Sequence, residues 1–351
     1  MKQTARRRVL SSLNRSTLPQ TPMLENHVAC QKVFEPEITV MVPVFNAQKY
    51  LSNCLKSILS QTFIHFEVVC VDDCSTDGSW EILQHYARMD PRIIPVRHKE
   101  NRGEGGARNT ALHLAKGTYV AGVDCDDCML PNMLETLYRH AIDSDADIVV
   151  CGYRQRNEDG KVVWEYRPQP AEMTMASSPD MFKVANPAFW NKLWRKSLFF
   201  DYQIFFPTGV YFEDLATSVK LFSKARKIKL IDDILYLYLS HPGSVTASFG
   251  PKYLMDSLKI LDGLRKFLVE EEKFAQCKPY FYAFAALHWK YHAGCVVQSN
   301  MPEAECQEYL KHVLILKQTF ESYDGRFDTL DKYSLYKMLD PRAMSPKMNS
   351  A

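Results

Sequence analysis

Three aspartates follow a short apolar run and give this chain its clearest capacity for chemistry. Residues 118–123 read T-Y-V-A-G-V, and Asp124, Asp126 and Asp127 come directly after them. Carboxylates this close together repel one another and shift each other's pKa unless a cation compensates them. Hard oxygen ligands of this kind favour Mg²⁺ or Mn²⁺. The alternative is an acidic turn that leads into a helix beginning near Pro131, and the spacing alone leaves both interpretations open.

Elements that could position these aspartates recur along the first half of the chain, where short apolar runs alternate with helical patterns. The runs that we expect to be strands are 38–44, 66–71, 92–97, 118–123 and 147–152. The patterns that we expect to be helices are 47–59, 78–89, 107–116 and 131–143. This alternation predicts an α/β fold with a mostly parallel, Rossmann-like sheet flanked by helices.

Polar clusters follow most of these runs. Asn46, the pair Asp72-Asp73, a glycine-rich loop at 101–106 and the aspartates at 124–127 all lie where a strand ends. Ligands of parallel sheets bind beyond the carboxyl ends of the strands. The arrangement therefore indicates a nucleotide-type ligand.

The second half of the chain gives weaker signals. Residues 153–212 are mixed and poor in strand patterns, and an apolar run at 228–239 ends at Ser240-His241. Amphipathic patterns predict a C-terminal helical extension. Its expected helices are 252–270, 278–298 and 303–322.

Composition excludes some classes of function. Hydrophobic residues make up 46% of the 351 residues, which is typical of a globular protein, and a net charge of only +2 gives no indication of nucleic acid. No apolar run approaches the roughly 20 residues needed to span a bilayer. We expect a cytoplasmic protein whose disordered basic segment, 1–36, can contact anionic lipid peripherally on the inner face of the membrane.

Five motifs, taken together in their order and spacing, resemble those of the family 2 glycosyltransferases. They are P-V-F-N at 43–46, V-D-D-C-S-T-D-G-S at 71–79, N-R-G-E-G-G-A-R-N at 101–109, D-C-D-D at 124–127 and E-D-L at 213–215. The resemblance implies a GT-A fold over residues 37–245 and an inverting enzyme that uses nucleotide-diphosphate sugars. It further implies donor binding by 37–152 and acceptor binding and catalysis by 153–245, followed by a helical region, 246–340, and a disordered tail, 341–351.

By this resemblance, the turn containing Pro43, Val44 and Asn46 holds the nucleotide together with Asp73. A carboxylate at a strand end can accept the imide N–H of uracil, whereas the structural alternative for Asp73 is an Asx-turn at the start of the next helix. For Asp77 we favour such a helix-capping role. Arg108 either pairs with the diphosphate or cross-links acidic loops.

The family's D-x-D pattern corresponds to Asp124 and Asp126. Asp126 would be a direct ligand of a divalent metal, Mn²⁺ or Mg²⁺, and Asp124 would contact the ribose or the metal. Cys125 stands where a small or polar residue is expected, which does not affect the ligands. The turn that contains His241 resembles a late segment of the family, which closes over the diphosphate in some members. We therefore include His241 among the expected metal ligands.

Asp214 matches the family's general base, with Glu213 as the second candidate. A carboxylate at a helix N-terminus has a lowered pKa, so we expect Asp214 to be ionised at neutral pH. Helix capping by either residue is the alternative. One such carboxylate without a second nucleophile indicates single displacement with inversion.

The predicted function is a metal-dependent inverting glycosyltransferase. It moves a sugar from a nucleotide-diphosphate donor, UDP-linked in our expectation, to a hydroxyl of a glycan or lipid-linked acceptor, as in cell-surface polysaccharide or lipopolysaccharide synthesis. One alternative is a non-catalytic nucleotide-sugar-binding partner of a glycan assembly complex. The other is a Mg²⁺-dependent nucleotidyltransferase, which would carry a glycine-rich loop after the first strand, where this chain reads P-V-F-N-A.

Overall fold

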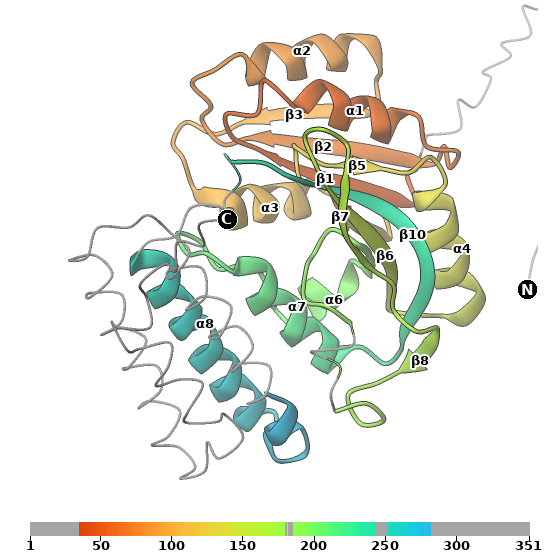
Figure 1. Ribbon diagram of the computed structural model, residues 1–351, viewed down its shortest axis with the longest axis vertical. Coiled ribbons are helices and arrows are strands. Elements are labelled where there is room, and N and C mark those ends of the chain that lie inside the picture. Colours follow the sequence, from red (N-terminus) through yellow and green to blue (C-terminus); the bar gives the residue numbers. More distant parts are fainter. Residues whose placement is uncertain (1–34, 180, 182–184, 243, 245–250, 282–351) are drawn as a thin grey trace, which may run out of the picture. The chain divides into compact units, whose positions relative to one another are not determined.

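The computed structural model describes residues 35–179, 181, 185–242, 244 and 251–281. These residues form one mixed sheet of ten strands (Figure 1). Its strands are β1 (Ile38–Val44), β2 (Phe66–Asp72), β3 (Ile93–Arg97), β4 (Tyr119–Gly122), β5 (Cys128–Met129), β6 (Ile148–Asn157), β7 (Val162–Tyr166), β8 (Ala171–Met173), β9 (Lys192–Arg195) and β10 (Ile228–Ser240).

The strand order places the predicted parallel half at one side of the sheet. The order is β3-β2-β1-β4-β9-β6-β10-β5, with β7 paired to β6 and β8 paired to β10. β1 pairs in parallel with both β2 and β4, while β9 is antiparallel to its neighbours β4 and β6. The carboxyl ends of β1, β2 and β4 therefore meet at one edge, as the sequence predicted.

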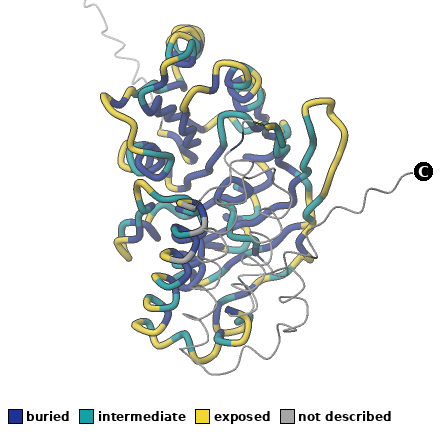
Figure 2. Tube along the Cα trace, turned by 60° about the vertical axis from the view of Figure 1, so that its left-hand side comes forward, coloured by how far each residue is buried: buried dark blue, intermediate teal, exposed yellow. Residues whose placement is uncertain are grey.

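Helices cover both faces of this sheet (Figure 1). They are α1 (Leu51–Leu59), α2 (Ser79–Met89), α3 (Gly103–Leu114), α4 (Met133–Ser144), α6 (Ser197–Asp201), α7 (Glu213–Lys224) and α8 (Pro251–Glu270). Alternation along β1 explains the two layers, because Val40 and Val42 join the core under α1, α2 and α4, whereas Met41 joins the core that contains α3, α7 and α8. The resulting burial is concentrated in the strands (Figure 2).

The fold class was predicted correctly, and the strands and helices expected between residues 38 and 152 are confirmed within a few residues. The expectation that 153–212 is poor in strands was wrong, because β6 continues to Asn157 and β7, β8 and β9 follow it. β7 gave no alternating signal because Val162, Val163 and Trp164 are all exposed. β9 has four residues and pairs with strands distant in the sequence, which a local pattern does not indicate.

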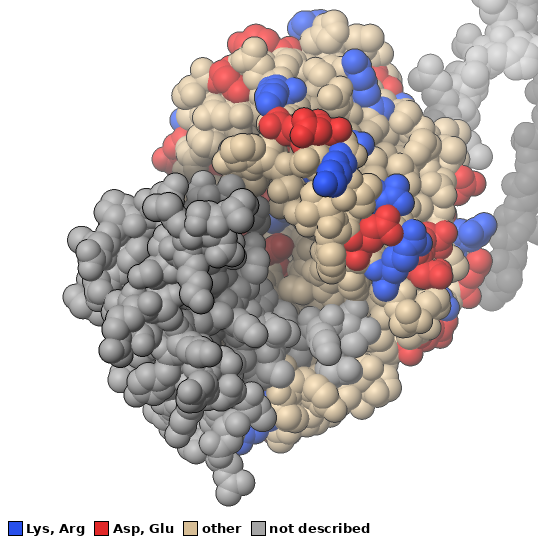
Figure 3. All heavy atoms as spheres, in the orientation of Figure 1, with Lys and Arg blue, Asp and Glu red and all other residues tan. Residues whose placement is uncertain are grey.

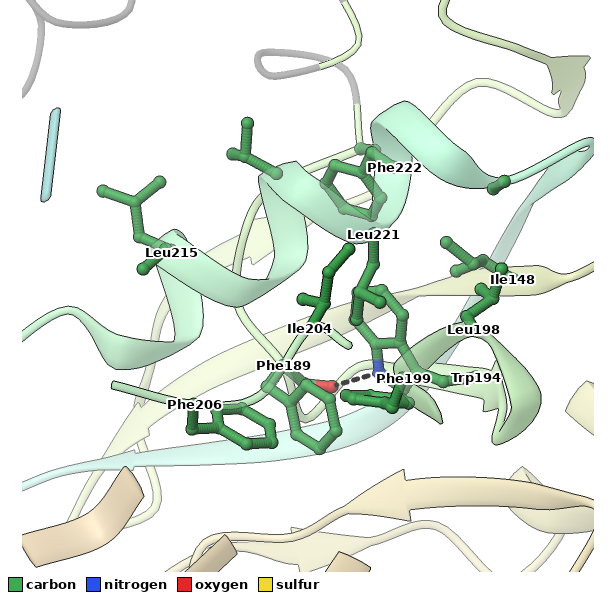
Figure 4. Packing of buried hydrophobic residues seen from close by; sticks show 14 of the residues in the cluster. Ile148, Phe189, Trp194, Leu198, Phe199, Ile204, Phe206, Leu215, Leu221 and Phe222 are labelled. Carbon is green, nitrogen blue, oxygen red and sulfur yellow. Dashed lines mark hydrogen bonds between the residues drawn. The ribbon is translucent and has the colours of Figure 1, made fainter. Parts of the chain in front are cut away.

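An aromatic core joins β9 to α7 (Figure 4). Trp194 stacks on Phe189 and Phe222 at centroid distances of 5.1 Å and 5.6 Å, and its Nε1 donates a hydrogen bond to the Phe189 carbonyl. Trp190 stacks on Tyr236 at 4.5 Å and is also buried. Both tryptophans therefore serve core packing.

The predicted helix 252–270 is confirmed as α8, which packs on α7. The helices expected at 278–298 and 303–322 lie outside the described residues except for 278–281, as do the tails except for 35–36. No helix within the described ranges combines the length and the apolar composition that a bilayer crossing requires.

Candidate active site

Three non-glycine residues with left-handed backbone lie in the loops that carry the predicted site. Asn46 follows β1 with φ 49°, Cys74 follows β2 with φ 65°, and Phe212 directly precedes α7 with φ 65°. Each costs roughly 1–3 kcal/mol, so the surrounding contacts must hold it in place. The first two loops bind each other, because Asn46 Oδ1 accepts a hydrogen bond from the Thr76 amide at 2.9 Å.

Asp73 is buried and anchors the segment after β3. Its carboxylate accepts hydrogen bonds from the Arg102 amide at 2.9 Å and 3.0 Å, and His98 Nδ1 lies 2.6 Å from Oδ1. These contacts do not form the Asx-turn that was the alternative for Asp73. Asp77 lies directly before the N-cap of α2, which is Gly78, and its Oδ1 accepts a hydrogen bond from the Ser79 amide at 3.0 Å, so it forms an Asx-turn at the helix start rather than the N-cap itself. Binding of a nucleotide by Pro43, Val44, Asn46 and Asp73 stays a prediction.

Arg108 is the centre of the site. Its buried guanidinium lies 2.5 Å from Glu213 and 2.8 Å from Asp124, and Nη2 lies 2.5 Å from Glu104. One cation thus faces three carboxylates that come from α3, from the end of β4 and from the start of α7. Of the two roles considered for Arg108, this geometry shows the cross-linking one, and pairing with a diphosphate stays a prediction.

Gly105 allows α3 to pack closely against the segment that precedes α7. A Cβ on Gly105 would lie 2.2 Å from the Pro207 carbonyl oxygen, which is far inside contact distance. Gly105 and Gly106 lie within α3 rather than in the loop that we expected, because the helix begins at Gly103. At these two positions the absence of a side chain therefore serves packing within the fold.

Burial leaves the carboxylates around Arg108 unusually basic. It raises the pKa of Asp124 to about 6 and the pKa of Glu213 to about 7, although the charge of Arg108 acts in the opposite direction. Burial also raises the pKa of Asp214, against the effects of Arg108 and of the Leu215 amide. The expectation of a lowered pKa for Asp214 was therefore wrong, because desolvation outweighs the helix N-terminus.

The aspartates after β4 are divided among three partners. Asp124 binds Arg108, and Asp126 Oδ2 lies 2.9 Å from His241 Nε2. Asp127 is buried, and its carboxylate accepts hydrogen bonds from the Tyr236 hydroxyl and the Leu239 amide of β10 at 2.8 Å and 2.7 Å. Asp127 therefore fixes the turn to β10, while Asp126 stays partly exposed beside His241.

The residues Asp126 and His241 fit a divalent metal that is shared with a substrate. No group of three or more His, Cys, Asp or Glu that could hold an ion occurs among the described residues. Mg²⁺ sites often use only one or two carboxylates and complete their coordination with substrate phosphates. A site of this kind would need the donor diphosphate to be complete.

Sequence reasoning missed three residues of this region. Glu104 could have been recognised from its i, i+4 spacing to Arg108. His98 and Lys192 gave no local signal, because the contact of His98 with Asp73 and the complete burial of Lys192 arise only in the folded chain.

Comparisons with known proteins agree with this architecture. The family described as Glycosyl transferase family 2 matches residues 39–203. EpsH of Bacillus subtilis (strain 168), which bears the name of a glycosyltransferase, is 31% identical over 72% of this chain and 75% of its own length. A poly(ribitol-phosphate) beta-glucosyltransferase of Bacillus spizizenii is 31% identical over 58% of this chain and 32% of its own length.

A solved structure shares the fold. The structure of S. aureus TarS 1–349 in complex with UDP-GlcNAc superposes with a TM-score of 0.56, covers 86% of this chain and 78% of its own, and is 23% identical. At that identity the likeness shows the fold alone. Together with the match to EpsH and with the motif residues gathered around Arg108, it leads to one conclusion: the chain belongs to the family 2 glycosyltransferases and is a glycosyltransferase.

Proposed function

We propose that this glycosyltransferase uses a divalent metal and a UDP-sugar donor, and that it transfers the sugar with inversion to a hydroxyl of a glycan or lipid-linked acceptor in the synthesis of a cell-surface polymer. The observation that carries the proposal is the Arg108 cluster, which unites Asp124 with the Glu213-Asp214 pair. Donor and acceptor chemistry would thus meet at one edge of the sheet. The name of the solved TarS complex includes UDP-GlcNAc, and the name of one relative includes a polyol-phosphate polymer, which supports both substrate classes.

In this proposal Asp214 is the general base. Its carboxylate takes the proton of the acceptor hydroxyl while the hydroxyl oxygen bonds to the anomeric carbon, and the bond from that carbon to the diphosphate breaks on the opposite face. The sugar is released from UDP with inverted configuration. A base is most effective when its pKa lies near the working pH, so the raised pKa of Asp214 suits this role.

The donor would lie along the ends of β1, β2 and β4. Residues 37–152 would bind it, with Pro43, Val44, Asn46 and Asp73 facing the nucleoside, while residues 153–245 would supply the base and the acceptor contacts. Asp126 and His241 would hold the metal, and Asp124, oriented by Arg108, would face the ribose. A bound divalent ion supplies positive charge where negative charge grows on the departing diphosphate.

The test is a screen of UDP-sugars that measures released UDP in the presence of Mn²⁺, followed by transfer assays on the wild type and Asp214→Asn. General-base catalysis contributes about 10²–10⁴-fold, so we expect the variant to lose at least about a hundredfold in kcat and to bind UDP as the wild type does. Glu213→Gln is the matched variant from the same helical turn. Full turnover by Asp214→Asn together with a deep loss in Glu213→Gln would move the base to Glu213.

A further inference from the structure

The turn of the β6–β7 hairpin contacts the segment that leads into α1, more than a hundred residues earlier in the chain (Figure 1). Glu158 makes this contact, because its Oε1 accepts a hydrogen bond from the Tyr50 hydroxyl at 2.9 Å and lies 2.5 Å from Lys49 Nζ. The turn is itself ordered. Asn157 Oδ1 accepts a hydrogen bond from the Lys161 amide at 2.9 Å, and the Asn157 amide donates to the Lys161 carbonyl at 3.1 Å. Glu158 is therefore presented from a fixed backbone.

Tyr50 connects this turn to the proposed metal site. The centroid of its ring lies 4.5 Å from that of the His241 imidazole, and the two planes are tilted by 35°. The side chain of His241 is only 7% exposed, and its Nε2 lies 2.9 Å from Asp126 Oδ2. Contacts therefore continue without a gap from the hairpin turn to the metal site.

The same hairpin also restrains the backbone of His241. β6 pairs in parallel with β10 as far as Asn157, whose partner is Ser240, the residue before His241. On the other side, the His241 carbonyl accepts hydrogen bonds from the Ser244 amide at 3.1 Å and from the Ser244 hydroxyl at 2.9 Å. Because the backbone is restrained, only the side-chain torsions of His241 can still move its imidazole, and the neighbouring ring of Tyr50 limits them.

We propose that Tyr50 and Glu158 are positioning residues, which hold the imidazole of His241 in the orientation that the divalent metal needs. The proposal rests on the role proposed above for His241 and Asp126 at the metal. Groups around a metal ligand fix its ring orientation, and their loss lowers metal affinity by about 10–100-fold. Lys49 supports the arrangement, because its Nζ meets the same oxygen of Glu158 and lies 4.9 Å from the centroid of the Tyr50 ring.

The exposure of Glu158 allows positioning to be separated from stabilisation. Exposed ion pairs contribute little to the free energy of unfolding, because water screens both charges and long side chains lose entropy. Lys49 and Glu158 form such a pair, since their side chains are 69% and 38% exposed. Glu158→Ala should therefore leave the urea midpoint close to that of the wild type, while it releases the Tyr50 hydroxyl. Weaker metal binding at unchanged stability is a result that a purely structural contact would not give.

The experiment compares Glu158→Ala and Tyr50→Phe with the wild type, each as the full chain. Both variants remove the hydrogen bond between the two residues, so a folding defect in one leaves the other as a test. The main readout is proton NMR of the histidine rings without metal, in which the His241 signal is identified by its loss in His241→Gln. We expect this signal to move toward the value of a solvent-exposed histidine in both variants. It should stay in place in Glu158→Gln, whose amide oxygen can still accept the Tyr50 hydroxyl.

The second readout is the affinity for Mn²⁺ in the presence of UDP, measured by isothermal titration calorimetry. We expect a loss of about tenfold in Glu158→Ala and in Tyr50→Phe, the lower end of the range for groups that orient a metal ligand. Glu165→Ala is the matched control, because Glu165 forms ion pairs with Arg154 and Arg167 on the same hairpin. This control should leave the His241 signal and the Mn²⁺ affinity unchanged.

An unmoved His241 signal in both Glu158→Ala and Tyr50→Phe would overturn the proposal. An equal loss of Mn²⁺ affinity in Glu165→Ala would also overturn it, because the effect would then not depend on the contact with Tyr50. The NMR measurement needs no metal, so it decides the positioning even if the wild type binds no Mn²⁺, a result that would refute the proposed metal instead.

Discussion

Two clusters of charged residues lie at opposite ends of the strands and differ in how completely they are compensated. At the amino ends, Asp147 precedes β6 and accepts hydrogen bonds from Arg195 Nε at 2.9 Å, from Arg226 Nη2 at 2.8 Å and from the Arg226 amide at 2.7 Å. At the carboxyl ends, Arg108 is the one cation that pairs with Glu104, Asp124 and Glu213 among the residues that the structure describes. In the first cluster two cations are shared between the buried Asp147 and the exposed Asp145, and in the second one cation is shared among three carboxylates.

The pKa values follow this difference. Burial acts to raise the pKa of Asp147, but the hydrogen bonds from Arg226 and the charges of Arg226 and Arg195 together lower it. Burial prevails at the other end and raises the pKa of Asp124 and Glu213. Basic and acidic side chains are interspersed over the described part of the face that Figure 3 shows. The carboxylate of the amino-end cluster is therefore compensated by its cations, whereas the carboxyl-end cluster holds more carboxylates than its cation compensates.

Loss of the proposed metal should affect activity, and we expect this effect to be the largest of those that distinguish the carboxyl-end cluster from the amino-end cluster. Chelation by EDTA should stop transfer and Mn²⁺ should restore it, because charge on the departing diphosphate would lose its main compensation. Asp126→Asn should lower kcat about 10²–10³-fold, a range typical of lost electrostatic stabilisation of the transition state. Direct titration of Mn²⁺ in the presence of UDP checks binding apart from turnover. Full activity in chelator would contradict the role of Asp126.

Arg108→Gln should cause the largest loss of stability. Removing the partner of buried carboxylates typically costs about 3–5 kcal/mol. The cost should be greatest near pH 8, where the three carboxylates are ionised, and smaller near pH 5, where protons replace the missing cation. Urea unfolding at the two pH values measures this difference. Arg108→Lys is the control that keeps the charge and loses the forked geometry, and an equal cost at both pH values would count against the charge argument.

Asp147→Asn should destabilise the chain with no change in catalysis. The loss of the hydrogen bonds to Arg195 and Arg226 should cost about 2–3 kcal/mol, a range typical of bonds to charged groups. Thermal unfolding measures the expected loss of stability, and kcat of the folded enzyme tests whether catalysis is unchanged. A fall in kcat at full occupancy of the folded state would show that the two ends are coupled.

The smallest expected effect is a slope of stability with pH. Glu213 and Asp124 have raised pKa values in the folded chain, so between about pH 4 and 7 the folded state holds more protons than the unfolded one. The free energy of unfolding should therefore fall as pH rises through this window, by on the order of 1–3 kcal/mol. Asp147 acts in the opposite sense. Its pKa is lowered in the folded chain, so the stability that its ionised form contributes is lost only as pH falls below about 4. Glu213→Gln should flatten the slope measured by urea unfolding, while Asp147→Asn should leave it unchanged.

The sequence predicted the parallel half of the fold because its signals are local. The strands β1, β2 and β4 are buried apolar runs, and each ends at the polar residues that mark the site. It did not predict β9, whose register depends on β4 and β6, or the burial that makes Asp214 more basic rather than less. Composition of a single segment does not reveal which charges the folded chain removes from water.

The turn that holds the three aspartates is fixed at both ends. Its amide at Asp124 donates to the Tyr236 hydroxyl, its amide at Asp127 donates to the Asp124 carbonyl, and Asp127 is bound to β10. A segment restrained in this way has little conformational entropy left to lose. An arriving donor would therefore find Asp126 already ordered, and its binding free energy would not be reduced by the need to arrange this part of the protein.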